Sequence, residues 1–193
     1  MKFDPYALGR VVMRLLWALP PLPIPRALVN VIVGNDMTPM KVRWLVLTLY
    51  GVRSRSWIIS ERCFFGGHDI TIGHDSGLNL GVWFDNAATI TIGDRVRFGP
   101  QVQLITSNHP LGGPDKRCAE PCVPAPIVIE DGVWITAGVI IGPGVTVGKG
   151  SVVAMGSVVT KDLPPHGYYA GSPAKLVKRF DDAPDEAETA VAG

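Results

Sequence analysis

The sequence is poor in cysteine. Its 193 residues include only Cys63, Cys118 and Cys122. This odd and sparse set does not form a disulfide framework, and no cleavable signal segment is recognisable, so we expect a reduced, cytoplasmic setting. Cys118 and Cys122 have the spacing of half a zinc site, but no second Cys or His pair accompanies them. We therefore expect no bound metal.

An excess of charge of one sign is also absent. The chain has 18 Lys and Arg against 17 Asp and Glu, a formal net charge of +1. This balance gives no support to nucleic-acid binding through a globally basic surface. The charge is nevertheless uneven, since residues 1–62 hold nine basic and three acidic residues while residues 181–193 hold five acidic residues and no basic one. We expect a neutral middle with charged ends.

The sequence has no long uninterrupted apolar run. Residues 11–33 are the most apolar stretch, but two arginines and four prolines interrupt them. They leave no clean run of about 18 apolar residues, so a membrane span is not expected. A peripheral membrane contact through residues 1–56 stays open, because basic residues beside Leu and Trp suit a headgroup surface.

Glycine, in contrast, is abundant, with 22 residues, and apolar side chains recur with a period of six. The repeat occupies Ile72, Leu78, Phe84 and Ile90, then Ile92, Phe98 and Leu104 after a slip of two, and finally Ile129, Ile135, Ile141, Val147, Val153 and Val159. Neither a helix nor a simple alternating strand has this period. Short strands joined by tight turns do, with three units to a coil of about 18 residues, and the coils must stack to bury their apolar sides. The sequence therefore predicts a mainly β fold, a parallel β-helix.

The hexad register lapses once, and that lapse predicts an extruded loop over residues 105–128. Before the repeat, Pro39 and Gly51 are good start and stop signals for a helix over residues 39–50. After the repeat, we expect a short helix around residues 174–180. Three regions result: a helical apolar and basic extension (1–56), the β-helix (57–163), and a C-terminal loop, short helix and acidic tail (164–193).

His109 is the one histidine on the extruded loop. Pro110 restricts its backbone, and a loop side chain can reach a substrate away from the solenoid. An idle surface histidine would look the same, so position alone leaves both interpretations open.

Six short motifs occur together in a fixed order: IGD at 92–94, TSNHP at 106–110, VWI at 133–135, PGVTVG at 143–148, GSVVTKD at 156–162 and AGSPAK at 170–175. With them, residues 70–180 resemble the hexapeptide-repeat bacterial O-acetyltransferases typified by the maltose, galactoside and nodulation-factor enzymes. The resemblance implies a left-handed β-helix, a homotrimer and acetyl-CoA or another acyl-CoA as co-substrate. It also gives His109 the role of catalytic base, which takes the proton of an attacking hydroxyl.

The resemblance further implies binding residues. The family's substrate asparagine falls on Asn79, for which a turn residue is the alternative. Its acidic partners are matched only by Asp85 and Asn86, which leaves the sugar specificity open. Coenzyme A is expected in a groove between subunits, with these residues: Trp134, Ala137, Met155, Thr160, Lys161, Lys175 and Lys178. Trp83 and Trp134 occupy outward positions of their hexads, which favours an interface or a ligand wall.

The leading hypothesis is therefore an O-acyltransferase that transfers an acyl group, most simply acetyl, directly to a sugar, a glycan precursor or another small hydroxylated acceptor. A mechanism with a covalent acyl-cysteine intermediate on the loop ranks below direct transfer. The alternatives are a non-catalytic scaffold, with or without membrane contact, and a zinc hydratase of the carbonic anhydrase type. The hydratase would need three histidines that converge between subunits, and only His68, His74 and His166 remain to join His109, none of them with the expected spacing from it.

Overall fold

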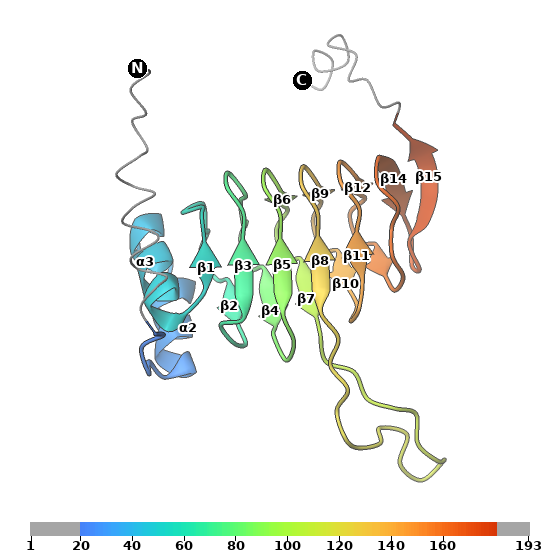
Figure 1. Ribbon diagram of the computed structural model, residues 1–193, viewed down its shortest axis with the longest axis horizontal. Coiled ribbons are helices and arrows are strands. Elements are labelled where there is room, and N and C mark those ends of the chain that lie inside the picture. The colour runs from blue at the N-terminus through green and yellow to red at the C-terminus, as the bar shows by residue number, and fades with distance from the viewer. Residues whose placement is uncertain (1–19, 181–193) are drawn as a thin grey trace.

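A computed structural model describes residues 20–180, in which two helices precede a three-sided solenoid of short strands (Figure 1). Each side of the solenoid is one sheet. Sheet I contains β1 (Arg53–Ser54), β3 (Ile70–Ile72), β5 (Ile90–Ile92), β8 (Ile127–Ile129) and β11 (Thr146–Val147). Sheet II contains β2 (Phe64–Phe65), β4 (Trp83–Asp85), β7 (Gln103–Ile105), β10 (Ile140–Ile141) and β13 (Val158–Val159). Sheet III contains β6 (Arg97–Phe98), β9 (Trp134–Ile135), β12 (Val152–Val153), β14 (Gly167–Ala170) and β15 (Lys175–Arg179).

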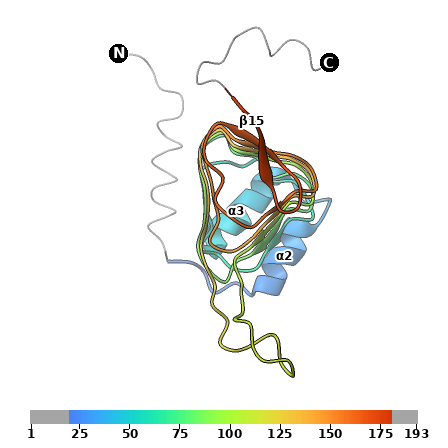
Figure 2. The same cartoon turned by 90° about the vertical axis from the view of Figure 1, so that its right-hand side faces the viewer.

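The chain winds from sheet I to sheet III to sheet II and back, one coil at a time. Strands of successive coils pair in parallel and in register, as Ile70 does with Ile90 and Ile90 with Ile127. Viewed from the C-terminal end, the ascending coil runs clockwise toward the viewer, which is a left-handed winding (Figure 2). The left-handed parallel β-helix is confirmed.

The six-residue repeat marks the side chains that fill the interior. Its aliphatic and aromatic members are buried, and the residue before each faces outward in strands such as β4 and β7. Phe65 and Phe84 stack inside the prism at 5.0 Å between ring centroids. No coil buries its apolar side alone, so stability comes from stacking successive coils.

Helices α2 (Arg26–Gly34) and α3 (Met40–Tyr50) close the N-terminal end of the solenoid (Figures 1 and 2). The sequence prediction of a helix over 39–50 is confirmed, with Gly51 as a left-handed C-cap at φ 116°. The Asn30 amide of α2 donates to the Phe65 carbonyl oxygen at 3.0 Å and accepts from the Phe65 N–H at 2.8 Å. It thus occupies the backbone groups of the terminal strand of sheet II, which would otherwise be an open edge.

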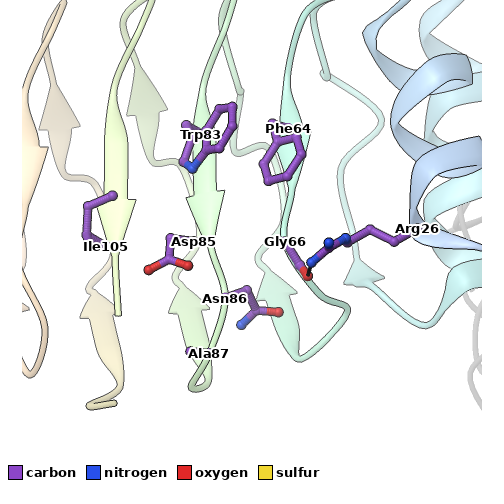
Figure 3. A pocket seen from close by; sticks show the side chains of 8 residues that line it. All are labelled: Arg26, Phe64, Gly66, Trp83, Asp85, Asn86, Ala87 and Ile105. Carbon is purple, nitrogen blue, oxygen red and sulfur yellow. Dashed lines mark hydrogen bonds between the residues drawn. The ribbon is translucent and has the colours of Figure 1, made fainter. Parts of the chain in front are cut away.

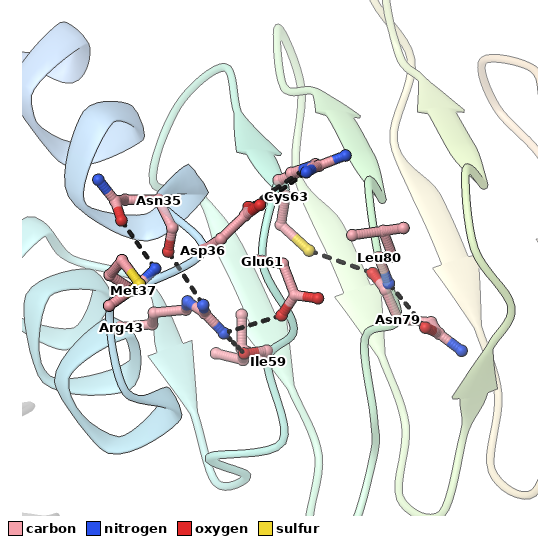
Figure 4. A network of polar contacts seen from close by, with 10 residues as sticks. Asn35, Asp36, Met37, Arg43, Ile59, Glu61, Cys63, Asn79 and Leu80 are labelled. Atoms are coloured by element: carbon pink, nitrogen blue, oxygen red, sulfur yellow. Dashed lines mark hydrogen bonds and ion pairs between the residues drawn. The ribbon is translucent and has the colours of Figure 1, made fainter.

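A polar network fastens this helical cap to the first coil (Figure 4). The buried Arg43 guanidinium donates to the carbonyl oxygens of Ile59 at 3.1 Å and Asn35 at 3.0 Å, and lies 3.5 Å from the Glu61 carboxylate. On the surface, the Arg62 guanidinium contacts both carboxylate oxygens of Asp36, at 3.1 and 2.6 Å, and its hydrogen bond lowers the pKa of Asp36.

The expected short helix around 174–180 is wrong. Residues Lys175–Arg179 form β15, an exposed strand that pairs antiparallel with β14. The last strand of sheet III would otherwise present unpaired backbone groups, which a strand satisfies and a helix does not. The paired strands run from β1 at Arg53 to β15 at Arg179. Residues 1–19 and the acidic tail from 181 lie outside the described residues.

No helix within residues 20–180 is long and apolar enough to cross a membrane. A peripheral contact through residues 1–56 stays a prediction.

Candidate functional site

The extruded loop leaves the solenoid after β7 and returns at β8, at the corner where sheet II passes into sheet I (Figure 1). Hydrogen bonds to residues 85–87 of the preceding coil hold the first residues of the loop, Thr106 and Ser107. The Ser107 N–H donates to Asp85 Oδ2 at 3.1 Å, and the Ala87 N–H donates to Thr106 Oγ1 at 2.8 Å. The Thr106 hydroxyl in turn donates to the Asp85 carbonyl oxygen. Asp85 therefore fixes the point from which the loop carries His109.

His109 is held by the returning arm of its own loop. Its Nδ1 lies 3.0 Å from the carbonyl oxygen of Ala119, and its side chain is 35% exposed. A carbonyl oxygen only accepts hydrogen bonds, so Nδ1 must carry the hydrogen of the neutral ring. Nε2 then has the free lone pair and is ready to accept a proton. Glu120 adds a carboxylate oxygen 3.9 Å from Nδ1, where it would stabilise a positively charged ring.

A cavity of about 500 Å³ lies on the outer face of sheet II, beside this corner (Figure 3). It runs from α2 across β2 and β4 to β7. Its walls are Arg26, Phe64, Gly66, Trp83, Asp85, Asn86, Ala87 and Ile105. Two of the predicted substrate residues, the sequence neighbours Asp85 and Asn86, both line this cavity. The Asn86 amide donates to the carbonyl oxygens of Ala88 at 2.5 Å and of Asp69 at 3.3 Å, while its buried Oδ1 has no hydrogen-bond partner among residues 20–180.

Asn79 does not join them within one chain. It is exposed in the turn that leads from sheet III to β4, the opposite end of that strand from Asp85. Its Oδ1 accepts from the Leu80 N–H at 2.8 Å, and its carbonyl oxygen accepts from the Cys63 thiol at 3.3 Å (Figure 4). These are the contacts of a turn residue, and a role in substrate binding stays a prediction.

Four of the seven residues predicted for coenzyme A divide between two corners of one chain. Ala137 and Met155 follow β9 and β12 at the corner from sheet III to sheet II, where they stack in successive coils, since the Gly156 N–H donates to the Ala137 carbonyl oxygen at 2.9 Å. Thr160 and Lys161 follow β13, at the same corner as the loop.

The remaining three predicted coenzyme residues lie on sheet III. Trp134 is an outward residue of β9 and is exposed, as the hexad position predicted, and so is Trp83 on sheet II. Lys175 and Lys178 are exposed on β15. The Lys178 ammonium lies 5.8 Å from the centroid of the Phe180 ring.

Within the described part of the chain, no group of three His, Cys, Asp or Glu side chains is placed to hold a metal ion. Cys118 and Cys122 are free and exposed, while Cys63 is buried, which raises the pKa of its thiol to about 12.

Sequence reasoning missed three features of this site: the Ala119 carbonyl oxygen that holds His109, the Glu120 carboxylate 3.9 Å from His109 Nδ1, and the cavity walls formed by Phe64 and Arg26. The hexad register could have assigned an outward position to Phe64, because it directly precedes the buried Phe65. Nothing in the spacing pairs Ala119 with His109, since both lie where the repeat has lapsed.

Comparisons with known proteins agree with this architecture. Residues 126–161 match the family model described as bacterial transferase hexapeptide (six repeats). A sophorolipid acetyltransferase of Starmerella bombicola is 41% identical over 149 residues, which is 77% of this chain but only 57% of that relative. Among solved structures, a maltose O-acetyltransferase from Clostridium difficile is 31% identical with a TM-score of 0.71, covering 81% of this chain and 85% of its own. A hexapeptide-repeat acetyltransferase from Vibrio cholerae, complexed with acetyl-CoA, is 30% identical with a TM-score of 0.69 over 93% of both chains. The chain therefore belongs to the hexapeptide-repeat acetyltransferase family.

Proposed function

We propose that this protein is an acetyl-CoA-dependent O-acetyltransferase that acts on a hydroxyl of a sugar, a glycan precursor or another small hydroxylated acceptor. The observation that carries the proposal is the hydrogen bond between His109 Nδ1 and the Ala119 carbonyl oxygen, which leaves Nε2 outside that contact and so supports a role for it as the base. The named activities of the relatives, acetylation of sophorolipid and galactoside, support a sugar-type acceptor. The free cysteines favour a cytoplasmic location.

In this mechanism His109 accepts one proton from the acceptor and then returns it to the leaving thiolate. Nε2 accepts the hydroxyl proton of the acceptor as its oxygen bonds to the acetyl carbon, and Glu120 stabilises the resulting imidazolium. The carbon–sulfur bond breaks, and the imidazolium returns the proton to the departing thiolate, so that ester and free thiol are the products. Acetyl-CoA supplies the activated acetyl group. Positioned proton transfer of this kind typically contributes about 10²–10⁴-fold to the rate.

A homotrimer would bring the divided binding residues together. One corner of the chain carries Ala137 and Met155, and another carries Thr160, Lys161 and the His109 loop. In the proposed assembly, the first corner of one subunit faces the second corner of the next, and the small Ala137 lets the pantetheine arm approach the backbone. Trp134 would contribute a wall to this groove, and Lys175 and Lys178 would meet its phosphates. Asn79 would then complete the acceptor site begun by Asp85 and Asn86.

Release of free thiol from acetyl-CoA tests the proposal, measured against a panel of sugars, nucleoside sugars, polyols and small natural-product alcohols. We expect at least one acceptor to raise the release rate well above the acceptor-free rate, with an O-acetyl ester identified by mass spectrometry. If no acceptor raises the rate, with acetyl or with longer acyl donors, the proposed activity is wrong. Sedimentation analysis tests the assembly, for which we expect three times the mass of the chain.

A further inference from the structure

We propose that the cavity on sheet II binds an apolar substituent of the acceptor, so that the preferred substrates are amphiphilic: a hydroxylated head joined to an aryl group or an alkyl chain. This inference rests on the proposed O-acetyltransferase function and names a substrate class for it. Three features carry it: the aromatic wall of the cavity, its polar end at the root of the His109 loop, and its size.

The aromatic wall is formed by two outward-facing rings of successive coils. Phe64 and Trp83 pair in register between β2 and β4, and their rings stack with 3.8 Å between centroids and 14° between planes. Both point away from the prism interior, which Phe65 and Phe84 fill instead. Trp83 remains 44% exposed. Two stacked rings that the core does not use present a flat apolar surface suited to another ring or an alkyl chain.

Ile105 extends this apolar wall toward the loop. It pairs with Asp85 in the register between β4 and β7 and lies on the same outward side as Trp83. The apolar strip therefore crosses three coils, from β2 to β7, and ends where the His109 loop begins.

The other side of the cavity is polar and leads to the proposed base. In Figure 3, Asp85 and Asn86 lie on the opposite side from the two rings. Asp85 accepts a hydrogen bond from the Ser107 N–H. His109 is two residues beyond Ser107, so the Cα atoms of Ser107 and His109 are at most about 7 Å apart. A ligand that places its hydroxyl at the Asp85 end, within reach of the loop, would lay its remaining part along the rings.

Arg26 closes the cavity at the end nearest the helical cap. Its guanidinium donates to the Gly66 carbonyl oxygen at 3.2 Å and reaches the cavity from α2, which the Asn30 amide fixes to β2. The cavity volume of about 500 Å³ lies within the range of about 300–1,000 Å³ that small-molecule sites have. A mostly apolar wall with a few convergent polar groups is the usual composition of such a site.

The test compares octyl glycosides with methyl glycosides of the same sugar, as acceptors in the thiol-release assay, at concentrations where octyl glycosides form no micelles. We expect kcat/KM for the octyl glucoside or octyl galactoside to exceed that for its methyl counterpart at least tenfold. In Trp83→Ala the ratio should fall below about threefold, and Trp83→Phe should restore most of it because a ring remains. Trp57→Ala is the matched control, since Trp57 is similarly exposed at 49% but does not line the cavity. Its ratio should equal that of the unaltered protein.

Calorimetric binding of octyl glucoside and methyl glucoside to the same proteins separates this inference from the proposed function. Tighter octyl binding that Trp83→Ala removes and Trp57→Ala retains supports the cavity assignment, even if neither glycoside is acetylated. Equal binding and equal kcat/KM for the two glycosides would overturn it, and so would an octyl preference that persists in Trp83→Ala. In both cases acetylation of the methyl glycosides would leave the proposed function intact.

Discussion

Replacing Glu120 with Gln should slow catalysis by a small and calculable amount. The carboxylate oxygen lies 3.9 Å from His109 Nδ1. At that distance a unit charge pair is worth about 1 kcal/mol in water and about 4 kcal/mol at an effective dielectric constant of 20. The Glu120 side chain is 66% exposed, so the lower value applies. Since about 1.4 kcal/mol is a factor of ten, Glu120→Gln should lower kcat about two- to fivefold.

The assay is thiol release with a saturating acceptor, at low salt and again at about 1 M salt. The loss should shrink at high salt, where the Debye length is only about 3 Å, and KM for acetyl-CoA should stay unchanged. Asp115→Asn is the control, because it removes another exposed carboxylate from the same loop. Unaltered kcat in Glu120→Gln would refute the electrostatic role. A loss as large as that caused by removing the imidazole would show that Glu120 takes part in the chemistry itself.

Other predictions concern the stability and reactivity of the fold. Gly73→Ala places a methyl carbon 2.3 Å from the Gly93 carbonyl oxygen of the next coil and should lower the urea-derived free energy of unfolding by about 1–3 kcal/mol, whereas Gly113→Ala meets nothing within 4 Å and should change it little. Arg43→Met should lower it by about 2–4 kcal/mol, because two backbone carbonyl oxygens lose their buried donor. Burial raises the pKa of Cys63 to about 12, so at pH 8 only the other two thiols should react with Ellman's reagent until the protein unfolds. The unfolded thiol ionises near pH 9, so the folded state binds the extra proton between pH 9 and about 12, and Cys63 should make the free energy of unfolding decline across that window.

The sequence predicted the solenoid well, because a six-residue period directly reports which side chain of each short strand faces inward. The helix ending at Gly51 was likewise predictable from local capping signals. The C-terminal segment was not, since Lys175–Arg179 has weak local preferences and takes its strand form from the open edge of β14. Long-range contacts decide such segments, and local patterns do not contain them.

The candidate site, too, was predictable only in part. His109 could be singled out because it lies in the TSNHP motif beside the repeat, whereas Asp85 was named only through the family resemblance. The contact between His109 and Ala119 depends on how an irregular loop folds back on itself, which no period encodes. The cavity wall depends on Phe64 and Trp83 being one coil apart in space.

The most direct test of the account is the turnover of His109→Ala with the best acceptor of the panel, compared with His74→Ala, which removes an exposed histidine from a turn of the solenoid. We expect at least a hundredfold lower kcat for His109→Ala, unchanged affinity for coenzyme A, and full activity for His74→Ala. Turnover of His109→Ala equal to that of the unaltered protein would contradict the account.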